Sequence, residues 1–228
     1  MQDLKKEAAR AALPFIRKNS TIGFGAGTTI AHLIGFIKED PALASSIITI
    51  TSSFSTRLLL QTARFRMAEM GSTDHIDLYF DGCDQFDRHL NALKSGGGIH
   101  TREKILAAMA NDFILLGDEP KSVEQLDGKF PLVIEVIPDA LSFVLSRLPE
   151  ILEGVSPAIR LADKKDGAVI TENGNFLIDC RFTSFPEPAQ VNEKVGMLPG
   201  VLEHSLFYGM AHKAIVAGNN GTIIKTRP

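Results

Sequence analysis

Short apolar segments alternate with segments of helical periodicity along the first half of the chain. The apolar segments are residues 21–24, 47–50, 76–80 and 113–116. The helical segments are residues 3–18, 30–37, 54–70 and 101–111. Parallel strands need a long crossover, usually a helix, and they are buried on both faces, so their sequences are continuously apolar. The alternation therefore predicts an α/β fold whose parallel sheet is covered by helices on both faces.

The pattern changes after Lys129. Later elements are expected as a strand at 130–137, a helix at 139–152, strands at 159–161 and 176–179, and a helix at 188–198. Asn173-Gly174 lies between the two short strands and is a hairpin signal. We therefore expect residues 130–206 to form a smaller α+β domain, while residues 1–129 and 207–228 form the larger one. A strand at 214–217 is expected to return to the first sheet.

The composition disfavours several classes of protein. With 228 residues, of which 44% are hydrophobic and 22% charged, the chain suits a globular domain with a small companion. A net charge of −3 and the absence of Trp argue against a nucleic-acid partner. No apolar run approaches the roughly 18 residues of a membrane span, and the charged N-terminal segment lacks a signal-peptide core. Two cysteines and six scattered histidines predict a cytoplasmic protein without disulfides or a metal.

Each expected strand of the first sheet ends in a polar loop. The loops are residues 25–29, 51–53, 81–84 and 118–121. The carboxyl ends of parallel strands lie at one edge of a sheet, and ligands of open α/β sheets bind at that edge. We therefore expect the loops to gather around one site.

The first of these loops, Gly25-Ala26-Gly27-Thr28-Thr29, predicts a seat for a phosphate group. Glycines let backbone amides approach an anion, and the following helix offers its positive N-terminal end. A tight turn without a ligand is the alternative, because the spacing alone is not specific. A dinucleotide site is disfavoured, because position 28 is not glycine and the second strand ends in Thr-Ser-Ser rather than an acidic residue.

A second group of residues suits proton transfer on a small anionic substrate. Asp81 and Asp84 are followed by Lys94, a glycine run at 96–98 and Glu103. A carboxylate can act as a general base, and a lysine can stabilise a developing oxyanion. A helix N-terminus would lower the pKa of Glu103, whereas burial or a nearby aspartate would raise it. The sequence leaves open which effect dominates, and also whether these charges are simply solvated.

These motifs, in this order, resemble the ribose-5-phosphate isomerase A family over nearly the whole chain. The matching segments are residues 25–29, 81–84, 94–98, 101–104, 121, 128–132, 135–138, 173–175, 199–201 and 206–207. The resemblance implies an α/β fold with a Rossmann-like parallel sheet domain and a smaller α+β (ferredoxin-like) domain. It also implies an aldose–ketose isomerase that interconverts D-ribose 5-phosphate and D-ribulose 5-phosphate through an enediolate, without a metal or cofactor.

The resemblance further implies a role for each site residue. Glu103 would move the proton between C1 and C2, and Asp81 would assist opening of the sugar ring. Asp84 and Lys94 would hold the sugar oxygens and stabilise the enediolate. The residues expected to bind substrate are Ala26, Gly27, Thr28, Thr29, Gly82, Cys83, Ser95, Gly96, Gly97 and Lys121. The family also implies a place in the pentose phosphate pathway and a homodimer or homotetramer.

Some positions depart from the common pattern of the family. Ala26 lacks a hydroxyl that is frequent there, Ser95 replaces a glycine, and Gln85 and His100 are also unusual. These departures leave open a different sugar phosphate as the substrate. A sugar-phosphate sensor without turnover is a third hypothesis, which the retained catalytic set disfavours. We interpret Cys83 as a small loop filler and His100 as a packing residue rather than a second acid or base.

Overall fold

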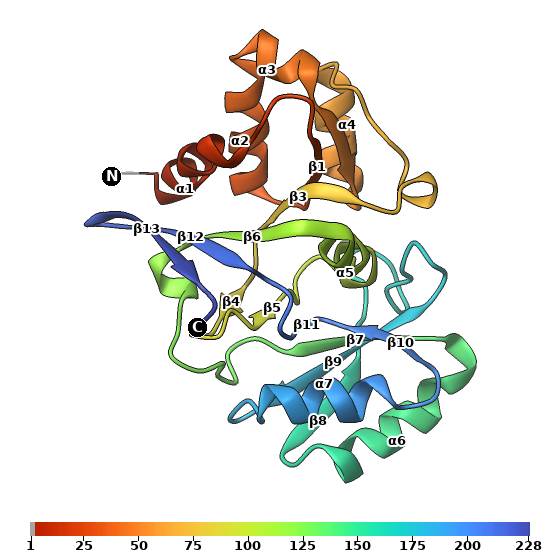
Figure 1. Ribbon diagram of the computed structural model, residues 1–228. Coiled ribbons are helices and arrows are strands. Elements are labelled where there is room, and N and C mark those ends of the chain that lie inside the picture. The colour runs from red at the N-terminus through yellow and green to blue at the C-terminus, as the bar shows by residue number, and fades with distance from the viewer. Residues whose placement is uncertain (1–2) are drawn as a thin grey trace.

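The computed structural model describes residues 3–228, which contain a six-stranded sheet with helices on both faces (Figure 1). The strand order is β13-β12-β6-β3-β1-β2, and the neighbouring strands are parallel except at the β12–β13 edge. The strands are β1 Thr21–Phe24, β2 Ile48–Thr51, β3 Ile76–Asp81, β6 Ala110–Asp118, β12 Lys213–Gly218 and β13 Gly221–Thr226. The predicted parallel sheet, including the returning last strand, is therefore confirmed.

The core is divided between the two faces of this sheet. Along β6, Ile114 and Leu116 pack with the helices of one face, while Phe113 and Leu115 pack with the helix of the other. Side chains alternate along a strand, so a strand covered on both faces must be apolar throughout. The helices of the first face are α1 Leu4–Ala12, α2 Thr28–Lys38, α3 Pro41–Ser46 and α4 Phe54–Thr62, and the opposite face carries α5 His100–Met109.

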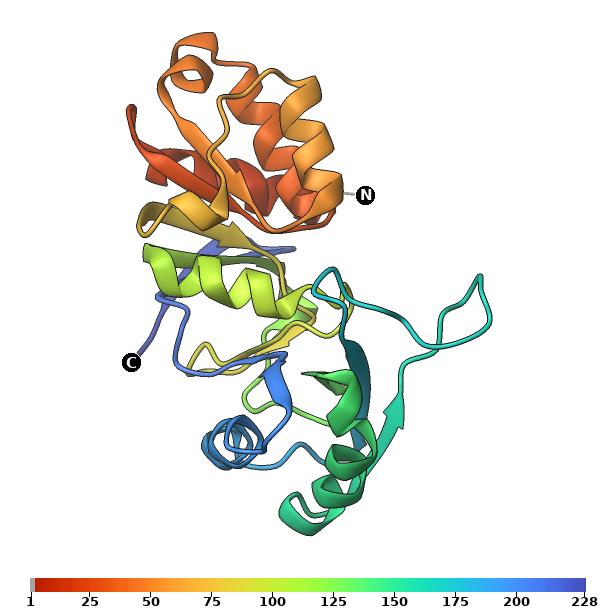
Figure 2. The ribbon, with the colours of Figure 1, turned by 90° about the vertical axis from the view of Figure 1, so that its right-hand side faces the viewer.

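A second sheet is antiparallel, in the order β10-β7-β9-β8. With its two helices it occupies the lower part of Figure 2. Its elements follow the chain as β7 Leu132–Val136, α6 Leu141–Ile151, β8 Val155–Ile159, β9 Phe176–Phe182, α7 Pro188–Gly196 and β10 Val201–His204. This βαββαβ succession, in which β10 lies beside β7 and β8 lies beside β9, is the ferredoxin-like arrangement. The two helices bury Val144, Leu148, Val191 and Val195 against the sheet. The fold class expected from the sequence is therefore confirmed, while the domain limits remain a prediction.

A small third sheet joins the two larger ones. Its strands are β4 Gln85–Phe86, β5 Ala92–Leu93 and β11 Leu206–Phe207, in the order β11-β5-β4. Lys94 directly follows β5, and Asp84 directly precedes β4, so this sheet fixes two residues of the predicted site. Helix α5 contacts β3 and β6 of the first sheet and β10 of the second, so it lies between them.

Several element boundaries differ from the predicted ones for local reasons. The first helix ends at Ala12 and gives way to a 3₁₀ turn that contains Pro14, and the helix predicted to reach 70 ends at Thr62, shortly before Arg64 turns to a φ of 63°. The Asn173-Gly174 turn exists, but it lies within the long connection from β8 to β9 rather than joining their ends. No helix within residues 3–228 is long and apolar enough to cross a membrane.

Candidate active site

A cavity of about 390 Å³ lies at the carboxyl ends of β1, β3 and β6. Its lining residues are Lys5, Ala26, Gly27, Thr28, Thr29, Asp81, Gly82, Cys83, Asp84, Lys94, Gly96, Gly97, Glu103 and Lys121. The loops at 25–29, 81–84 and 118–121 therefore meet as predicted, together with the first turn of α5. The loop at 51–53 contributes instead to a neighbouring cavity of about 540 Å³.

Asp81 is the most constrained acidic residue of the cavity. Its Oδ1 accepts hydrogen bonds from the amides of Ala26 at 3.2 Å and Gly82 at 2.7 Å, and the residue is 1% exposed. A Cβ atom at Gly25 would lie 1.8 Å from the same oxygen. Glycine at position 25 is therefore needed for the strand end of β1 to approach the carboxylate.

Lys94 connects the acidic residues to one another. Its Nζ lies 2.7 Å from Oδ2 of Asp81 and 3.4 Å from Oε1 of Glu103, and it donates to the carbonyl of Gly82 at 2.6 Å. Burial disfavours the ammonium charge, but the two carboxylates outweigh burial and raise the pKa of Lys94 above its ordinary value. Lys94 is therefore a permanent positive charge inside the site.

Glu103 points from the first turn of α5 toward this charge, and it is 4% exposed. Burial raises the pKa of Glu103 to about 8, with a further contribution from Asp81, while Lys94 opposes the rise. Burial is therefore the largest influence on this pKa, and it outweighs the attraction of Lys94. A carboxylate with such a pKa is a stronger base than an ordinary glutamate and still ionises near neutral pH.

The loop after β1 has the geometry of an anion seat. Gly27 adopts a φ of 96°, a conformation that favours glycine, and it directly precedes α2. Among the described residues, no side chain caps this helix, so its first amides are available to a ligand. Lys121 lies nearby and donates from Nζ to the carbonyl of Cys83 at 2.7 Å.

The cavity therefore combines uncapped amides at the start of α2 with a buried carboxylate of raised pKa and a buried positive charge. Proteins of known family are similar to this chain in sequence. The family model for ribose 5-phosphate isomerase A (phosphoriboisomerase A) matches residues 48–221. The ribose-5-phosphate isomerase A of Thermosynechococcus vestitus is 32% identical, and the alignment covers 100% of this chain and 95% of that protein. The chain belongs to the ribose-5-phosphate isomerase A family.

Further relatives agree with this membership. The ribose-5-phosphate isomerase A of Pyrococcus abyssi is 35% identical over 97% of this chain and 96% of its own. The structure of ribose 5-phosphate isomerase A from Methanocaldococcus jannaschii superposes with a TM-score of 0.89 at 33% identity and covers 98% of each chain. A D-ribose-5-phosphate isomerase in complex with phospho-erythronic acid gives a TM-score of 0.92 at 34% identity, over 100% of both chains.

The activity of this isomerase is the interconversion of ribose 5-phosphate and ribulose 5-phosphate. The comparisons favour neither a different sugar phosphate nor a sensor without turnover.

Two residues that depart from the family pattern have structural contacts here. The Oγ of Ser95 donates to the carbonyl of Pro131 at 2.5 Å, so the hydroxyl expected to touch substrate faces the second sheet. Its amide donates to Asp84 at 2.5 Å and thereby fixes that carboxylate. The side chain of Gln85 accepts from the amide of Asp127 at 3.0 Å. Both side chains therefore hold loops of the isomerase in place.

The interpretations of Cys83 and His100 agree with their surroundings. Burial raises the pKa of the Cys83 thiol to about 12, which leaves the unreactive thiol form at neutral pH. Burial lowers the pKa of His100 to about 4, and its Nε2 lies 3.3 Å from the carbonyl oxygen of Glu203. A neutral, fully buried imidazole behind the cavity fits a packing role in this isomerase.

Two contributors to the site were not predicted from the sequence. Lys5 reaches the cavity from α1, and Tyr79 donates from Oη to Oδ2 of Asp81 at 2.5 Å from beneath. The charge of Lys5 was visible in the sequence, but its position depends on where α1 packs. Tyr79 was part of an apolar strand segment, and its hydroxyl signals a buried acceptor only once the strand's faces are known.

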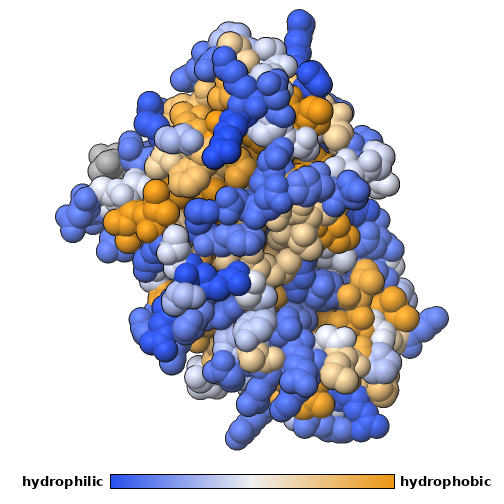
Figure 3. Space-filling view, in the orientation of Figure 1, coloured by the Kyte–Doolittle hydropathy of each residue, from blue (hydrophilic) through white to orange (hydrophobic). Residues whose placement is uncertain are grey.

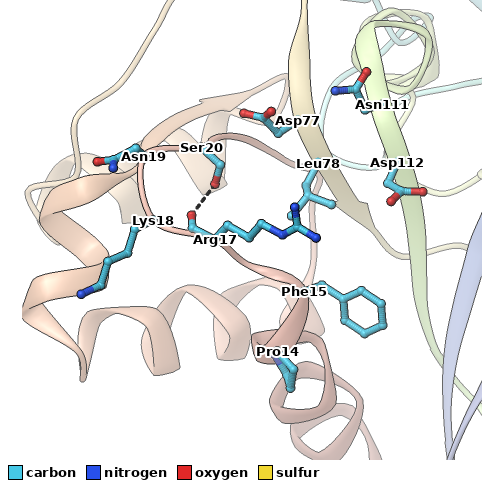
Figure 4. Close-up of a pocket in the computed structure, with 10 residues that line it drawn as sticks. All are labelled: Pro14, Phe15, Arg17, Lys18, Asn19, Ser20, Asp77, Leu78, Asn111 and Asp112. Atoms are coloured by element: carbon cyan, nitrogen blue, oxygen red, sulfur yellow. Dashed lines mark hydrogen bonds between the residues drawn. The ribbon is translucent and has the colours of Figure 1, made fainter.

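A further cavity, of about 410 Å³, lies at the opposite edge of the first sheet (Figure 4). Its polar residues include Arg17, Ser20, Asp77 and Asp112, at the amino ends of β1, β3 and β6. Ser20 donates to the carbonyl of Arg17 at 2.6 Å, and Asp77 accepts from the amide of Thr21 at 2.7 Å. These bonds stabilise the strand starts, on the side of the sheet away from the predicted catalytic residues.

Proposed function

We propose that Glu103 is the base that moves the proton between C1 and C2 of the sugar, and that Lys94 stabilises the enediolate. The observation that carries this proposal is the placement of the Lys94 ammonium between the carboxylates of Asp81 and Glu103 in a buried part of the cavity. Charges act most strongly where water is excluded and the donors are already in position.

The proposed isomerisation proceeds by proton transfers alone and needs no oxidant or reductant. In ring opening, Asp81 takes the proton of the C1 hydroxyl, and the bond between C1 and the ring oxygen breaks as the aldehyde forms. Asp81 then gives the same proton to the former ring oxygen and is ionised again. Glu103 then takes the proton from C2, and the negative charge that develops on O1 faces Lys94. A proton then passes from O2 to O1, and we propose that Asp84 lies beside these two oxygens and carries it. Glu103 finally returns its proton to C1, which leaves the ketone at C2.

We propose that the phosphate binds at residues 26–29, where the amides at the start of α2 and the hydroxyls of Thr28 and Thr29 supply donors. Lys5 and Lys121 add positive charge at the same cavity. A helix N-terminus with uncapped amides is a favourable place for a dianion. The relative that was solved in complex with phospho-erythronic acid supports a phosphorylated, sugar-like ligand.

We further propose a homodimer or homotetramer in the cytoplasm, acting in the pentose phosphate pathway, with residues 130–206 as a separate domain. Apolar patches on the face in Figure 3 support self-association, and one follows the edge strand β13, where Ile223 and Ile224 are exposed. The free, buried thiols of Cys83 and Cys180 suit a reducing compartment. Light scattering that gives the mass of a single chain at micromolar concentration would contradict the oligomer.

The role of Glu103 is tested by replacing the carboxylate with an amide of the same shape. Glu103→Gln is expected to lower kcat for ribulose 5-phosphate formation by roughly 10²- to 10⁴-fold, the usual contribution of a general base. Glu153→Gln makes the same chemical change at an exposed residue and serves as the control. Equal rates for wild type and Glu103→Gln would overturn the assignment.

A further inference from the structure

The two residues that precede Glu103 contact the second sheet and its β8–β9 connection rather than the sheet that carries the cavity. Thr101 donates from its hydroxyl to the carboxylate of Glu135 in β7, in a short hydrogen bond. Arg102 donates to the carboxylate of Glu172 at 2.9 Å, and Glu172 lies in the turn within the β8–β9 connection. The first turn of α5 is therefore held from behind while Glu103 faces the cavity.

Glu135 is the centre of these contacts. It is 1% exposed in the middle of a strand, where an ionised carboxylate is costly unless donors surround it. Besides Thr101, its donors are the Thr171 hydroxyl at 2.7 Å and the side-chain Nδ2 atoms of Asn173 and Asn175 at 3.0 and 2.9 Å. Burial works against the charge, but these donors lower the pKa of Glu135 below its ordinary value. The carboxylate therefore stays ionised and accepts all of these hydrogen bonds.

The start of α5 depends on such outside contacts. Among residues 3–228, no side chain caps its N-terminus, and the preceding residue, Ile99, is apolar. An anionic group near a helix N-terminus is favourable, and Glu135 supplies one through Thr101. Farther along the same helix, Lys104 donates to the carboxylate of Glu203 at 2.7 Å, again toward the second sheet.

We propose that Glu135 is a positioning residue that fixes the first turn of α5 through Thr101 and so holds Glu103 at its working distance from Lys94. The inference rests on the proposed role of Glu103. The hydrogen bonds of Glu135 come from residue 101 and residues 171–175, none of which belongs to the proposed phosphate seat at 26–29. Their loss should therefore lower kcat and leave KM nearly unchanged.

Thr101 allows a matched test, because its hydroxyl can be removed or kept with little change in shape. Thr101→Val is expected to lower kcat roughly 10- to 100-fold, as small displacements of a reacting group do, with KM within about twofold. Thr101→Ser keeps the hydroxyl and should restore most of kcat. Thr171→Val removes another donor from the same carboxylate without touching α5, so its loss of kcat should be much smaller.

Several results would overturn the proposal. These are wild-type kcat in Thr101→Val, equal losses in Thr101→Val and Thr171→Val, or a rise in KM at constant kcat. If Thr101→Val does not fold, Glu135→Asp offers the same test, because it keeps the charge but shortens the side chain by one methylene. It should lower kcat at constant KM, and an unchanged kcat would contradict us. Parallel assays of Glu103→Gln separate the two proposals: an inactive Glu103→Gln beside an unaffected Thr101→Val rejects the positioning role alone.

Discussion

The cavity has a buried half, formed by Asp81, Lys94 and Glu103, and an exposed half, formed by residues 26–29. The buried half carries charged side chains, and the exposed half offers backbone amides. Asp81, Lys94 and Glu103 are 1%, 7% and 4% exposed, and Lys94 contacts both carboxylates. Residues 26–29 are partly or fully exposed and offer backbone amides. With the roles proposed above, proton transfer depends on the exclusion of water, which shifts pKa values, whereas phosphate binding uses donors that are in contact with solvent. Changes in the buried half should therefore act on kcat, and changes in the exposed half on KM.

After Glu103→Gln, the largest effect is expected from Lys94→Met. It removes the positive charge and leaves Asp81 and Glu103 facing each other in a buried site, so kcat should fall by roughly 10²- to 10³-fold. The free energy of unfolding should also fall, by about 3–5 kcal/mol for the loss of one partner of a buried ion pair. Lys121→Met is the control in the other half of the cavity, and equal kcat losses in the two variants would refute the division.

A smaller effect on kcat is expected from Gly25→Ala, which tests the junction between the halves. The added methyl group would lie 1.8 Å from Asp81 Oδ1 and must displace either the carboxylate or the end of β1. We expect a loss of roughly 10- to 100-fold in kcat from this misplacement. Gly35→Ala in α2 is the control, because its methyl group meets no atom within 4 Å. Wild-type kcat in Gly25→Ala would show that Asp81 tolerates displacement.

The smallest effect on kcat is expected in the exposed half. Thr28→Val removes a hydroxyl from the phosphate seat, and KM should rise about tenfold if that interaction is equally strong in the ground and transition states. Steady-state kinetics with ribose 5-phosphate measures both constants. A fall in kcat at constant KM would show that this threonine acts on the chemistry instead.

The sequence allowed the strands and polar loops of the first sheet to be predicted, because buried parallel strands are continuously apolar and their ends are polar. The two-residue strands β4, β5 and β11 are too short to show any periodicity. The contacts of Glu135 were equally hidden, since a glutamate within a strand is usually exposed and its donors at 171–175 lie far along the chain.

The site, too, could be predicted only in part from the sequence. The residues of 81–84 and 94–103 could be proposed from their chemical types, but the orientation of Ser95 and the arrival of Lys5 depend on packing. The pKa of Glu103 depends on its burial and on the positions of Lys94 and Asp81, which only the folded chain determines.

The central claim is that Glu103, with a pKa raised to about 8 by burial, is the base. The most direct test is the pH dependence of kcat/KM, which reports ionisations of the free enzyme. Because the base must be ionised, kcat/KM should rise with pH and level off above a midpoint near 8. Asp81→Asn should lower the midpoint, since Asp81 raises the pKa of Glu103, and Lys94→Met should raise it. A wild-type midpoint near the ordinary glutamate value of 4.5 would contradict the account.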